Sequence, residues 1–268
     1  MSATDTAELR RRFRTLHQTG IFVMPNPWDV GSARLLEVVG FPALATTSSG
    51  LGAALGRDDQ TVGRDELVRH VAELTAAVGI PVSVDAECAF PREPGGVAET
   101  VRMLADAGAS GVSIEDFDPV AGEVLALERA SEAVGQAVEA AARHGLVVTA
   151  RAENHLYDRD DLDDTVRRLR AYVAAGADAV YAPGLTDADD IARLVAEAGA
   201  PVNVLALPGA PSVPELGRLG VRRVSTGGGL TWTAYGALVD AARTLLDEGR
   251  YAFLEHGLDP EVRARAFG

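Results

Sequence analysis

The feature that most constrains this chain is a repeat in which a helix-like segment ends, a short apolar run follows, and polar residues come directly after that run. The apolar runs are rich in β-branched and aliphatic residues, which is typical of strands buried on both faces. Amphipathic segments separate them, and several end in Gly, as in Ala107-Gly108-Ala109 and Ala175-Gly176-Ala177. The repeat predicts parallel strands joined by helical crossovers.

Eight such units in one chain favour an α/β fold of the closed (β/α)₈ TIM type over an open doubly wound sheet. A Gly-x-Gly-x-x-Gly turn does not follow the first strand, which weakens the dinucleotide-binding alternative. The expected strands are 21–24, 43–46, 81–85, 111–115, 147–151, 179–181, 202–205 and 223–225, and the expected helices include 64–78, 97–107, 130–143, 162–175 and 187–198.

We expect residues 1–268 to form a single barrel domain, with 233–268 as an extra C-terminal helical extension. In this extension, 237–246 is amphipathic and 261–267 is short and mixed. An extra helix after a complete barrel can pack on a neighbouring subunit or cap its own barrel. The sequence leaves both arrangements open.

The composition excludes several classes of partner. The 268 residues carry a formal net charge of −14, which argues against nucleic acid and against an anionic membrane surface, because both need basic patches. There is no apolar run of transmembrane length, and the polar N-terminus lacks an apolar signal core. Cys88 is the only cysteine, so an intrachain disulfide is impossible. We therefore expect a cytoplasmic protein.

The acids and one arginine fall at the carboxyl ends of the expected strands, which form the active face of a parallel barrel. Strand 81–85 delivers Asp85 and Glu87, and strand 111–115 delivers Glu115 and Asp116. Strand 147–151 delivers Arg151 and then Glu153. These carboxylates and the guanidinium would then converge on one rim, which suits a divalent cation and an anionic substrate.

Asp85-Ala86-Glu87 is the candidate metal motif. On an extended strand end these carboxylates point the same way, and hard cations prefer oxygen ligands. Because Mg²⁺ keeps several waters, one direct carboxylate with others acting through water is a plausible shell, with Asp58 and Glu115 as outer members. These acids could instead cap helices or pair with arginines, but the gathering of several strand-end acids favours the metal site.

Arg151 follows a wholly apolar strand, and its planar fork suits a carboxylate or phosphonate. A structural ion pair with Glu153 or Glu115 is an equal and compatible alternative. The hydroxyl-rich run 46–50 could hold a substrate carboxylate on backbone N–H groups, or be an ordinary loop of turn formers. Gly227-Gly228-Gly229 could likewise hold a phosphate or be a flexible loop.

Cys88 and His155 are weaker candidates. The neighbouring carboxylates are expected to raise the pKa of the Cys88 thiol and blunt it as a nucleophile, so a small buried apolar role is favoured. His155 is the only histidine placed to reach the site, and a surface role is favoured for it.

At these residues the chain resembles the isocitrate lyase/phosphoenolpyruvate (PEP) mutase superfamily, over nearly its whole length. The pieces that carry the resemblance are 25–34, Ala45-Thr46-Thr47-Ser48-Ser49-Gly50-Leu51, Gly56-Arg57-Asp58, Val84-Asp85-Ala86-Glu87, Ser113-Ile114-Glu115-Asp116, Ala150-Arg151-Ala152-Glu153-Asn154 and 176–185.

The resemblance implies a barrel that binds Mg²⁺ and a 2-oxo or enol-type acid. It makes Asp85 the direct metal ligand and lets Ser49, Gly50 and Leu51 hold the substrate carboxylate, while Arg151 balances charge at the reacting end. It also implies a homotetramer with a swapped C-terminal helix. The candidate residues are, as catalytic groups, Arg151, Asp58 and Glu115; as substrate-binding groups, Trp28, Ser48, Ser49, Gly50, Leu51, Asp85, Arg151 and Glu153; and as metal ligands, Asp85, Glu87 and Glu115.

The chain also departs from the family pattern. Isocitrate and methylisocitrate lyases carry a Lys-Lys-Cys-Gly-His or Lys-Arg-Cys-Gly-His loop after the Glu-Asp strand end, whereas the run 117–124 here has no Lys, Cys or His. It also lacks the Lys and the Asn or Thr that phosphonate mutases and hydrolases use in this loop. Pro183 stands where the family often has His or Glu, and Cys88-Ala89-Phe90-Pro91 replaces a Gly-rich turn.

These features predict a Mg²⁺-dependent lyase that cleaves a C–C bond, by decarboxylation or retro-aldol chemistry, in a small 2-oxo or 2-hydroxy dicarboxylic acid through a metal-stabilised enolate. The expected partner is this small carboxylic acid, with further copies of the chain as subunits. A phosphonopyruvate-type P–C mutase or hydrolase is the alternative among enzymes. A barrel that binds a 2-oxo acid without turnover is the alternative from another class.

Overall fold

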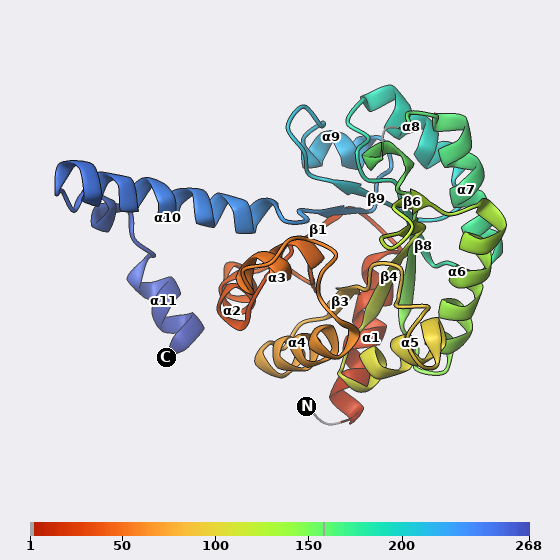
Figure 1. Ribbon diagram of the computed structural model, residues 1–268, viewed down its shortest axis with the longest axis horizontal. Coiled ribbons are helices and arrows are strands. Elements are labelled where there is room, and N and C mark those ends of the chain that lie inside the picture. Colours follow the sequence, from red (N-terminus) through yellow and green to blue (C-terminus); the bar gives the residue numbers. More distant parts are fainter. Residues whose placement is uncertain (1–2, 158) are drawn as a thin grey trace.

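The computed structural model describes residues 3–157 and 159–268, and its centre is a sheet of eight parallel strands (Figure 1). Each predicted strand is confirmed, with shifts of one residue at some ends. In chain order the strands are β1 Phe22–Met24, β2 Leu44–Ala45, β3 Val82–Asp85, β4 Gly111–Glu115, β7 Val147–Arg151, β8 Ala179–Tyr181, β9 Val202–Leu205 and β10 Arg223–Ser225.

The spatial order of the strands is that of a barrel. It runs β1-β10-β9-β8-β7-β4-β3-β2, so each strand pairs with its neighbours in the chain and the order does not reverse in the middle. At the seam between β1 and β2, Ala45 N donates to Pro25 O at 3.0 Å and Asn26 Nδ2 donates to Thr46 O at 2.7 Å. The fold is the predicted (β/α)₈ TIM-type barrel, and the doubly wound alternative is excluded.

Helices surround the strands, because each crossover buries one apolar face against the sheet and leaves a charged face outside. The five predicted helices are confirmed within three residues at their ends. Asp161 and Asp187 accept backbone N–H groups as N-caps of two of them. The outer helices are α2 Val30–Val39, α4 Arg64–Ala77, α5 Gly96–Asp106, α6 Leu127–Ala142, α7 Leu162–Ala174, α8 Ala188–Glu197 and α9 Val213–Arg218.

Helix α1 (Ala3–Leu16) closes the amino-terminal end of the barrel. Arg10 donates to the carbonyl of Ala109, two residues before β4, and to the carbonyl of His144, three residues before β7. Phe13 is fully buried against Gly111, where a Cβ would come within 2.5 Å of the ring. With this end closed, the carboxyl ends of the strands form the open mouth of the barrel.

The C-terminal segment leaves the barrel. Helix α10 (Gly229–Glu248) projects away from it, and α11 (Pro260–Phe267) returns beside α2, where Arg265 Nη2 donates to Val38 O at 3.1 Å (Figure 1). A short 3₁₀ helix, η2 (Ala252–His256), connects the two. Both predicted helical segments are confirmed, although the extension starts at Gly229. Among the described helices, none combines the length and apolarity that crossing a bilayer requires.

Candidate active site

A cavity of about 200 Å³ opens at the carboxyl ends of the strands. Of the predicted site residues, Ser48, Ser49, Asp85 and Arg151 line it. The other polar residues on its wall are Asn26, Thr46, Thr47, Asp59, Ser83, Ser113, Tyr181, Asn203, Arg223 and Ser225. Polar side chains thus line a cavity at the carboxyl ends of the strands, where the sequence pattern predicted them.

Arg151, at the end of β7, lies at the centre of three carboxylates. Its Nη1 donates to Asp85 Oδ1 at 2.7 Å and its Nε donates to Glu153 Oε1 at 2.8 Å. Its Nη2 lies 3.3 Å from Glu115 Oε2, and its guanidinium carbon lies 5.2 Å from the centre of the Tyr181 ring. The ion pairs considered for Glu153 and Glu115 thus both form, and Asp85 adds a third. The single positive charge of this arginine is therefore shared by three carboxylates.

The acids around Arg151 are buried, and burial disfavours their charged forms. Burial raises the pKa of Glu115 well above its usual range, although Arg151 opposes this shift. Burial likewise raises the pKa of Glu153, again against the effect of Arg151. Burial alone would lower the pKa of the Arg151 guanidinium, but Glu153, Asp85 and Glu115 together raise it. Three carboxyl groups therefore share one arginine, and burial disfavours the charged forms of Glu115 and Glu153.

Glu87 is the least satisfied of these acids. Its side chain is buried, and among the described residues its carboxylate has no hydrogen-bond or ion-pair partner. Burial, followed by the charges of Asp85 and Asp59, raises the pKa of Glu87 to about 8. A cation beside it would remove this penalty.

The turn after β3 is strained. Glu87, Ala89 and Phe90 adopt φ values of 51°, 57° and 50°, in the left-handed region that favours Gly. Each such residue costs on the order of 1 kcal/mol. This is the turn in which the chain departs from a Gly-rich family segment, and non-glycine residues adopt left-handed φ values here at an energetic cost. The strained turn places Glu87 next to the cavity-lining Asp85.

The segment after β2 is helical, which corrects the expectation of a loop. Thr47 caps α3 (Ser48–Ala54), and its Oγ1 accepts from Gly50 N at 3.2 Å. Ser48 N and Oγ donate to Asp85 Oδ2 at 3.3 and 3.2 Å. Gly50 is required here, because a Cβ would lie 2.5 Å from Thr47 Cγ2 and 2.6 Å from Thr231 Oγ1. The backbone of Ser48 and Ser49 can therefore approach the cavity closely.

Several predicted residues lie elsewhere. Asp58 is exposed and does not line the cavity, because the 57–60 loop turns Asp59 inward instead. Gln60, with a left-handed φ of 62°, donates from Nε2 to Glu115 Oε1 at 2.9 Å. Leu51 lies in the hydrophobic core, and the Trp28 ring packs against Tyr235 of α10. Asp59 and Gln60 were missed, because loop geometry decides which acid of the Asp58-Asp59 pair faces inward.

Asp116 does not join the rim, contrary to the expectation that it converges there with the other strand-end carboxylates. It faces α7, where it accepts from Tyr172 OH at 2.6 Å and Arg168 Nη1 at 3.1 Å. It also accepts from Glu153 N at 2.8 Å. Adjacent residues on a strand face opposite sides, so Glu115 points into the barrel and Asp116 points out. Asp116 positions the Glu153 backbone from behind.

The run 117–124 forms a hairpin of β5 (Phe117–Asp118) and β6 (Glu123–Val124). Asp118 accepts two hydrogen bonds from Arg92, at 2.9 and 2.7 Å. The Phe117 ring stacks on Tyr157, which follows the 3₁₀ helix η1 (Asn154–Leu156), with ring centres 3.7 Å apart. The hairpin is thus fixed on both sides by residues that local patterns did not reveal.

The remaining candidates are Cys88, His155 and the turn Gly227-Gly228-Gly229. Cys88 is half-buried, and burial, with smaller effects of nearby acids, raises its pKa to about 11, in the expected direction. The expected surface role of His155 is wrong, because its side chain is only 8% exposed; its Nε2 lies 2.8 Å from Thr165 Oγ1 and so ties η1 to α7. Gly227 and Gly228 line the cavity, and the Gly227 backbone N donates to Asn26 Oδ1 at 3.0 Å, which anchors this turn before α10.

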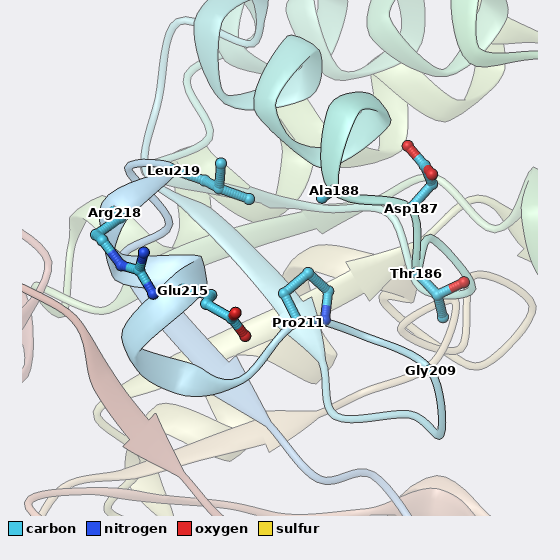
Figure 2. Close-up of a pocket in the computed structure, with 8 residues that line it drawn as sticks. All are labelled: Thr186, Asp187, Ala188, Gly209, Pro211, Glu215, Arg218 and Leu219. Carbon is cyan, nitrogen blue, oxygen red and sulfur yellow. The ribbon is translucent and has the colours of Figure 1, made fainter.

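A larger depression, of about 560 Å³, lies between α8 and α9 (Figure 2). Its acids already have partners. Asp187 caps α8, and Glu215 accepts from both N and Oγ of Ser212 at the start of α9. The depression lacks the convergence of buried charge found at the barrel mouth, so the candidate active site is the cavity around Asp85 and Arg151.

A (β/α)₈ barrel with polar and buried charged side chains gathered at the carboxyl ends of its strands has the architecture of barrel enzymes, whose active sites lie at this end. The family model described as phosphoenolpyruvate phosphomutase matches residues 13–246. The chain therefore belongs to this family, among the lyases and mutases of the isocitrate lyase/PEP mutase superfamily, as the resemblance implied.

Three similar proteins illustrate the range of the family. An uncharacterized protein of Mycobacterium tuberculosis is 34% identical over 88% of this chain and 89% of its own length. An oxaloacetate decarboxylase of Bradyrhizobium sp. (strain ORS 278) is 30% identical over 82% of this chain and 78% of its own. A crystal structure from Burkholderia cenocepacia J2315, provisionally described as a lyase/mutase, is 44% identical with a TM-score of 0.94, covering 99% of this chain and 98% of that one.

Proposed function

We propose that the protein is a Mg²⁺-dependent lyase that breaks a C–C bond next to the 2-oxo carboxylate of a small dicarboxylic acid, with decarboxylation of oxaloacetate as the first reaction to test. The observation that carries this proposal is the gathering of Asp85, Glu115 and Glu153 around Arg151 at the mouth of the barrel. The decarboxylase of Bradyrhizobium supports the choice of reaction, as a relative at 30% identity.

The residues present fit Mg²⁺. The donors are carboxylates and hydroxyls, which hard cations prefer, and the buried Glu87 carboxylate has no partner within the described chain. No three His, Cys, Asp or Glu side chains of the described residues are close enough together to hold an ion between them. The proposed shell is therefore one in which Asp85 alone would hold the ion directly, while Glu87 and Glu115 would act through water.

When bound, the ion would supply positive charge next to the substrate oxygen on which negative charge develops. The side chains provide the rest. Ser48 and Ser49 lie on the wall beside Asp85, where their N–H and hydroxyl groups can orient a substrate carboxylate. Arg151 fixes Asp85 and presents its cation to the reacting end. The stacked Phe117 and Tyr157 rings hold the adjoining hairpin in place.

The hairpin limits the range of reactions. It contains no Lys, Cys or His that could serve as a proton donor. Decarboxylation places less demand on such an acid than cleavage of a larger leaving group does, because the product can take its proton from water. We therefore rank decarboxylation first and cleavage of a hydroxy acid second.

We propose further that copies of the chain assemble as homotetramers that exchange the C-terminal segment. Helix α10 exposes apolar side chains along its length, including Trp232, Leu238 and Leu246, which are 55%, 66% and 84% exposed. Burying these residues on a second copy would remove this apolar surface from water. The proposed location is the cytoplasm, in agreement with a single unpaired cysteine.

The assay of the reaction uses purified protein with oxaloacetate and Mg²⁺, followed by release of CO₂, with EDTA as one arm and Asp85→Asn as another. We expect turnover that both EDTA and the substitution abolish. Activity that survives EDTA would refute the requirement for Mg²⁺. Turnover of phosphonopyruvate in phosphorus NMR would reverse the ranking in favour of a mutase or hydrolase, and binding of 2-oxo acids without turnover of any would indicate the non-catalytic barrel.

The assembly is tested separately by light scattering coupled to gel filtration. We expect a mass four times that of the chain, and a smaller mass for the double variant Leu238→Glu and Leu246→Glu. A monomer for the unmodified protein would refute the exchange. The matched control is Val120→Glu in the turn between β5 and β6, an apolar residue that is 75% exposed and lies outside the C-terminal segment.

A further inference from the structure

Arg223 is a buried cation that lines the cavity and has no acidic partner among the described residues. It lies at the start of β10, and its side chain is directed into the barrel, with Ser225 two residues further along on the same face. Only 3% of the residue is exposed. Arg223 is not among the site residues predicted from the sequence, because a single arginine within a predicted strand does not form a recognisable motif.

The guanidinium makes three hydrogen bonds, all to neutral groups. Nε donates to Asn203 Oδ1 at 2.9 Å, and Nη2 donates to Thr149 Oγ1 at 3.0 Å. Nη1 lies 3.0 Å from His17 Nε2. Since Nδ1 of this histidine lies 2.9 Å from the carbonyl of Phe13, the neutral tautomer with Nε2 as acceptor fits both contacts. A guanidinium has five N–H groups, so two remain for another acceptor.

No charge in this network compensates the arginine. Burial, with help from Arg223, lowers the pKa of His17 to about 3, so this histidine is neutral at pH 7. Burial also lowers the pKa of Arg223 to about 10, in contrast to the raised pKa of Arg151. An uncompensated buried cation is costly, and a bound anion is the usual remedy.

The two arginines that line the cavity therefore differ in what they offer a ligand. Arg151 is engaged by three carboxylates, whereas Arg223 is surrounded by Asn203, Thr149 and other neutral groups. The acids lie near Arg151 and the free positive charge lies near Arg223. Within the cavity, a bound cation is therefore favoured near the acids around Arg151, and a bound anion is favoured near Arg223.

We propose that Arg223 binds the second carboxylate of the substrate, the one remote from the 2-oxo group, and so makes the site selective for dicarboxylates. This assignment rests on the proposed function, because it takes the 2-oxo carboxylate to lie at the Asp85 end. A planar fork with two spare N–H groups matches a carboxylate in bidentate geometry. The competing interpretation is that Arg223 only ties α1 to the barrel through His17.

The test measures binding of two ligands in the presence of Mg²⁺ by calorimetry. One is 3,3-difluorooxaloacetate, a dicarboxylate, and the other is 2-oxobutyrate, which has a methyl group in place of the second carboxylate. We expect the unmodified protein to prefer the dicarboxylate. Arg223→Met should weaken dicarboxylate binding by about 10- to 100-fold and change 2-oxobutyrate binding by less than about twofold, because only one charge-assisted contact is lost.

Two further variants separate ligand binding from folding. Arg223→Lys keeps the charge and should retain part of the preference, which also serves if the Met variant does not fold. Arg222→Gln removes the neighbouring arginine, which only reaches the Gly20 carbonyl, and should behave like the unmodified protein. Equal loss of both ligands in the Arg223 variants, or no loss of either, would overturn the assignment.

The outcomes for the site and for the reaction remain distinguishable. An unmodified protein that prefers the dicarboxylate through Arg223 but releases no CO₂ refutes the proposed reaction and leaves the assignment of Arg223 in place. A protein that decarboxylates oxaloacetate while Arg223→Met binds the dicarboxylate unchanged refutes the assignment alone. An unmodified protein that binds the two ligands equally also refutes it.

Discussion

Arg151 Nη1 lies 2.7 Å from Asp85 Oδ1, and this contact joins the ends of β7 and β3, which are not adjacent in the sheet. Glu115 of the intervening strand β4 and Glu153 complete the shell of the arginine. Arg151 thus has three acidic partners, whereas each of these acids has Arg151 as its only ion-pair partner among the described residues. Substitution of Arg151 and substitution of one of the acids should therefore lower the free energy of unfolding by different amounts.

Arg151→Met should destabilise the protein by about 3 to 5 kcal/mol, because it leaves buried carboxylates unpaired. Asp85→Asn should cost about 1 kcal/mol, since the arginine keeps two acids and the amide oxygen can still accept a hydrogen bond. Urea unfolding measures both values. Both variants should lose activity, so activity alone does not distinguish them, and similar unfolding midpoints would contradict the asymmetry.

Glu87 should make Mg²⁺ binding depend on pH. Burial, Asp85 and Asp59 raise its pKa to about 8, so without metal it holds a proton below that pH. A carboxylate near a cation must lose this proton, and the apparent Mg²⁺ affinity should therefore rise up to about tenfold per unit between pH 6 and 8. Glu87→Gln should flatten this rise. Calorimetry at pH 6, 7 and 8 tests it, and equal affinities for the unmodified protein would exclude the role of Glu87.

The same shift has a consequence for stability without metal. A carboxyl group with a raised pKa in the folded state contributes stability below its unfolded pKa of 4.5 and loses it as the pH rises through about 8. In EDTA, Glu87→Gln should therefore gain stability relative to the unmodified protein between pH 6 and 9. Added Mg²⁺ should reduce the difference. Thermal unfolding across this range measures both effects.

Gly50→Ala should destabilise the protein by about 1 to 3 kcal/mol, because the new Cβ overlaps Thr47 Cγ2 and Thr231 Oγ1. The overlap would also move Ser49 away from the cavity and lower activity. The matched control is Gly135→Ala in α6, where nothing lies within 4 Å, and which should be neutral or stabilising by up to about 1 kcal/mol. Guanidinium unfolding compares the two, and equal effects would contradict the close approach at Gly50.

His17 should make the protein sensitive to acid. Its folded pKa is about 3, chiefly because of burial, against an ordinary value of 6.5. Between these values the unfolded state binds more protons, so stability falls as the pH drops from 6.5 to 3, by up to about 1.4 kcal/mol per unit. His17→Gln should reduce the slope, while His256→Gln, on exposed η2, should leave it unchanged. Equal slopes for all three proteins would show that His17 is not the sensor.

The strands and most of the helices could be predicted because their signals are local. Val147–Arg151 is a continuous apolar run, and Asp187 precedes a helical period as an N-cap. Such patterns fix which strands exist and which residues stand at their carboxyl ends. Helix α1 was not predicted, and the hydroxyl-rich segment after β2 was taken for a loop although Thr47 caps a helix there.

The sequence by itself therefore determined a barrel of eight strands and a polar mouth with Asp85, Glu115 and Arg151 on its rim. Only the tertiary structure decided that Asp59 faces inward in place of Asp58, that Asp116 turns outward to Tyr172, and that Arg223 stays without an acid. The physical reason is that periodicity and capping act over a few residues. The partner of a buried charge depends on strand register and loop course, which bring together residues far apart in the chain.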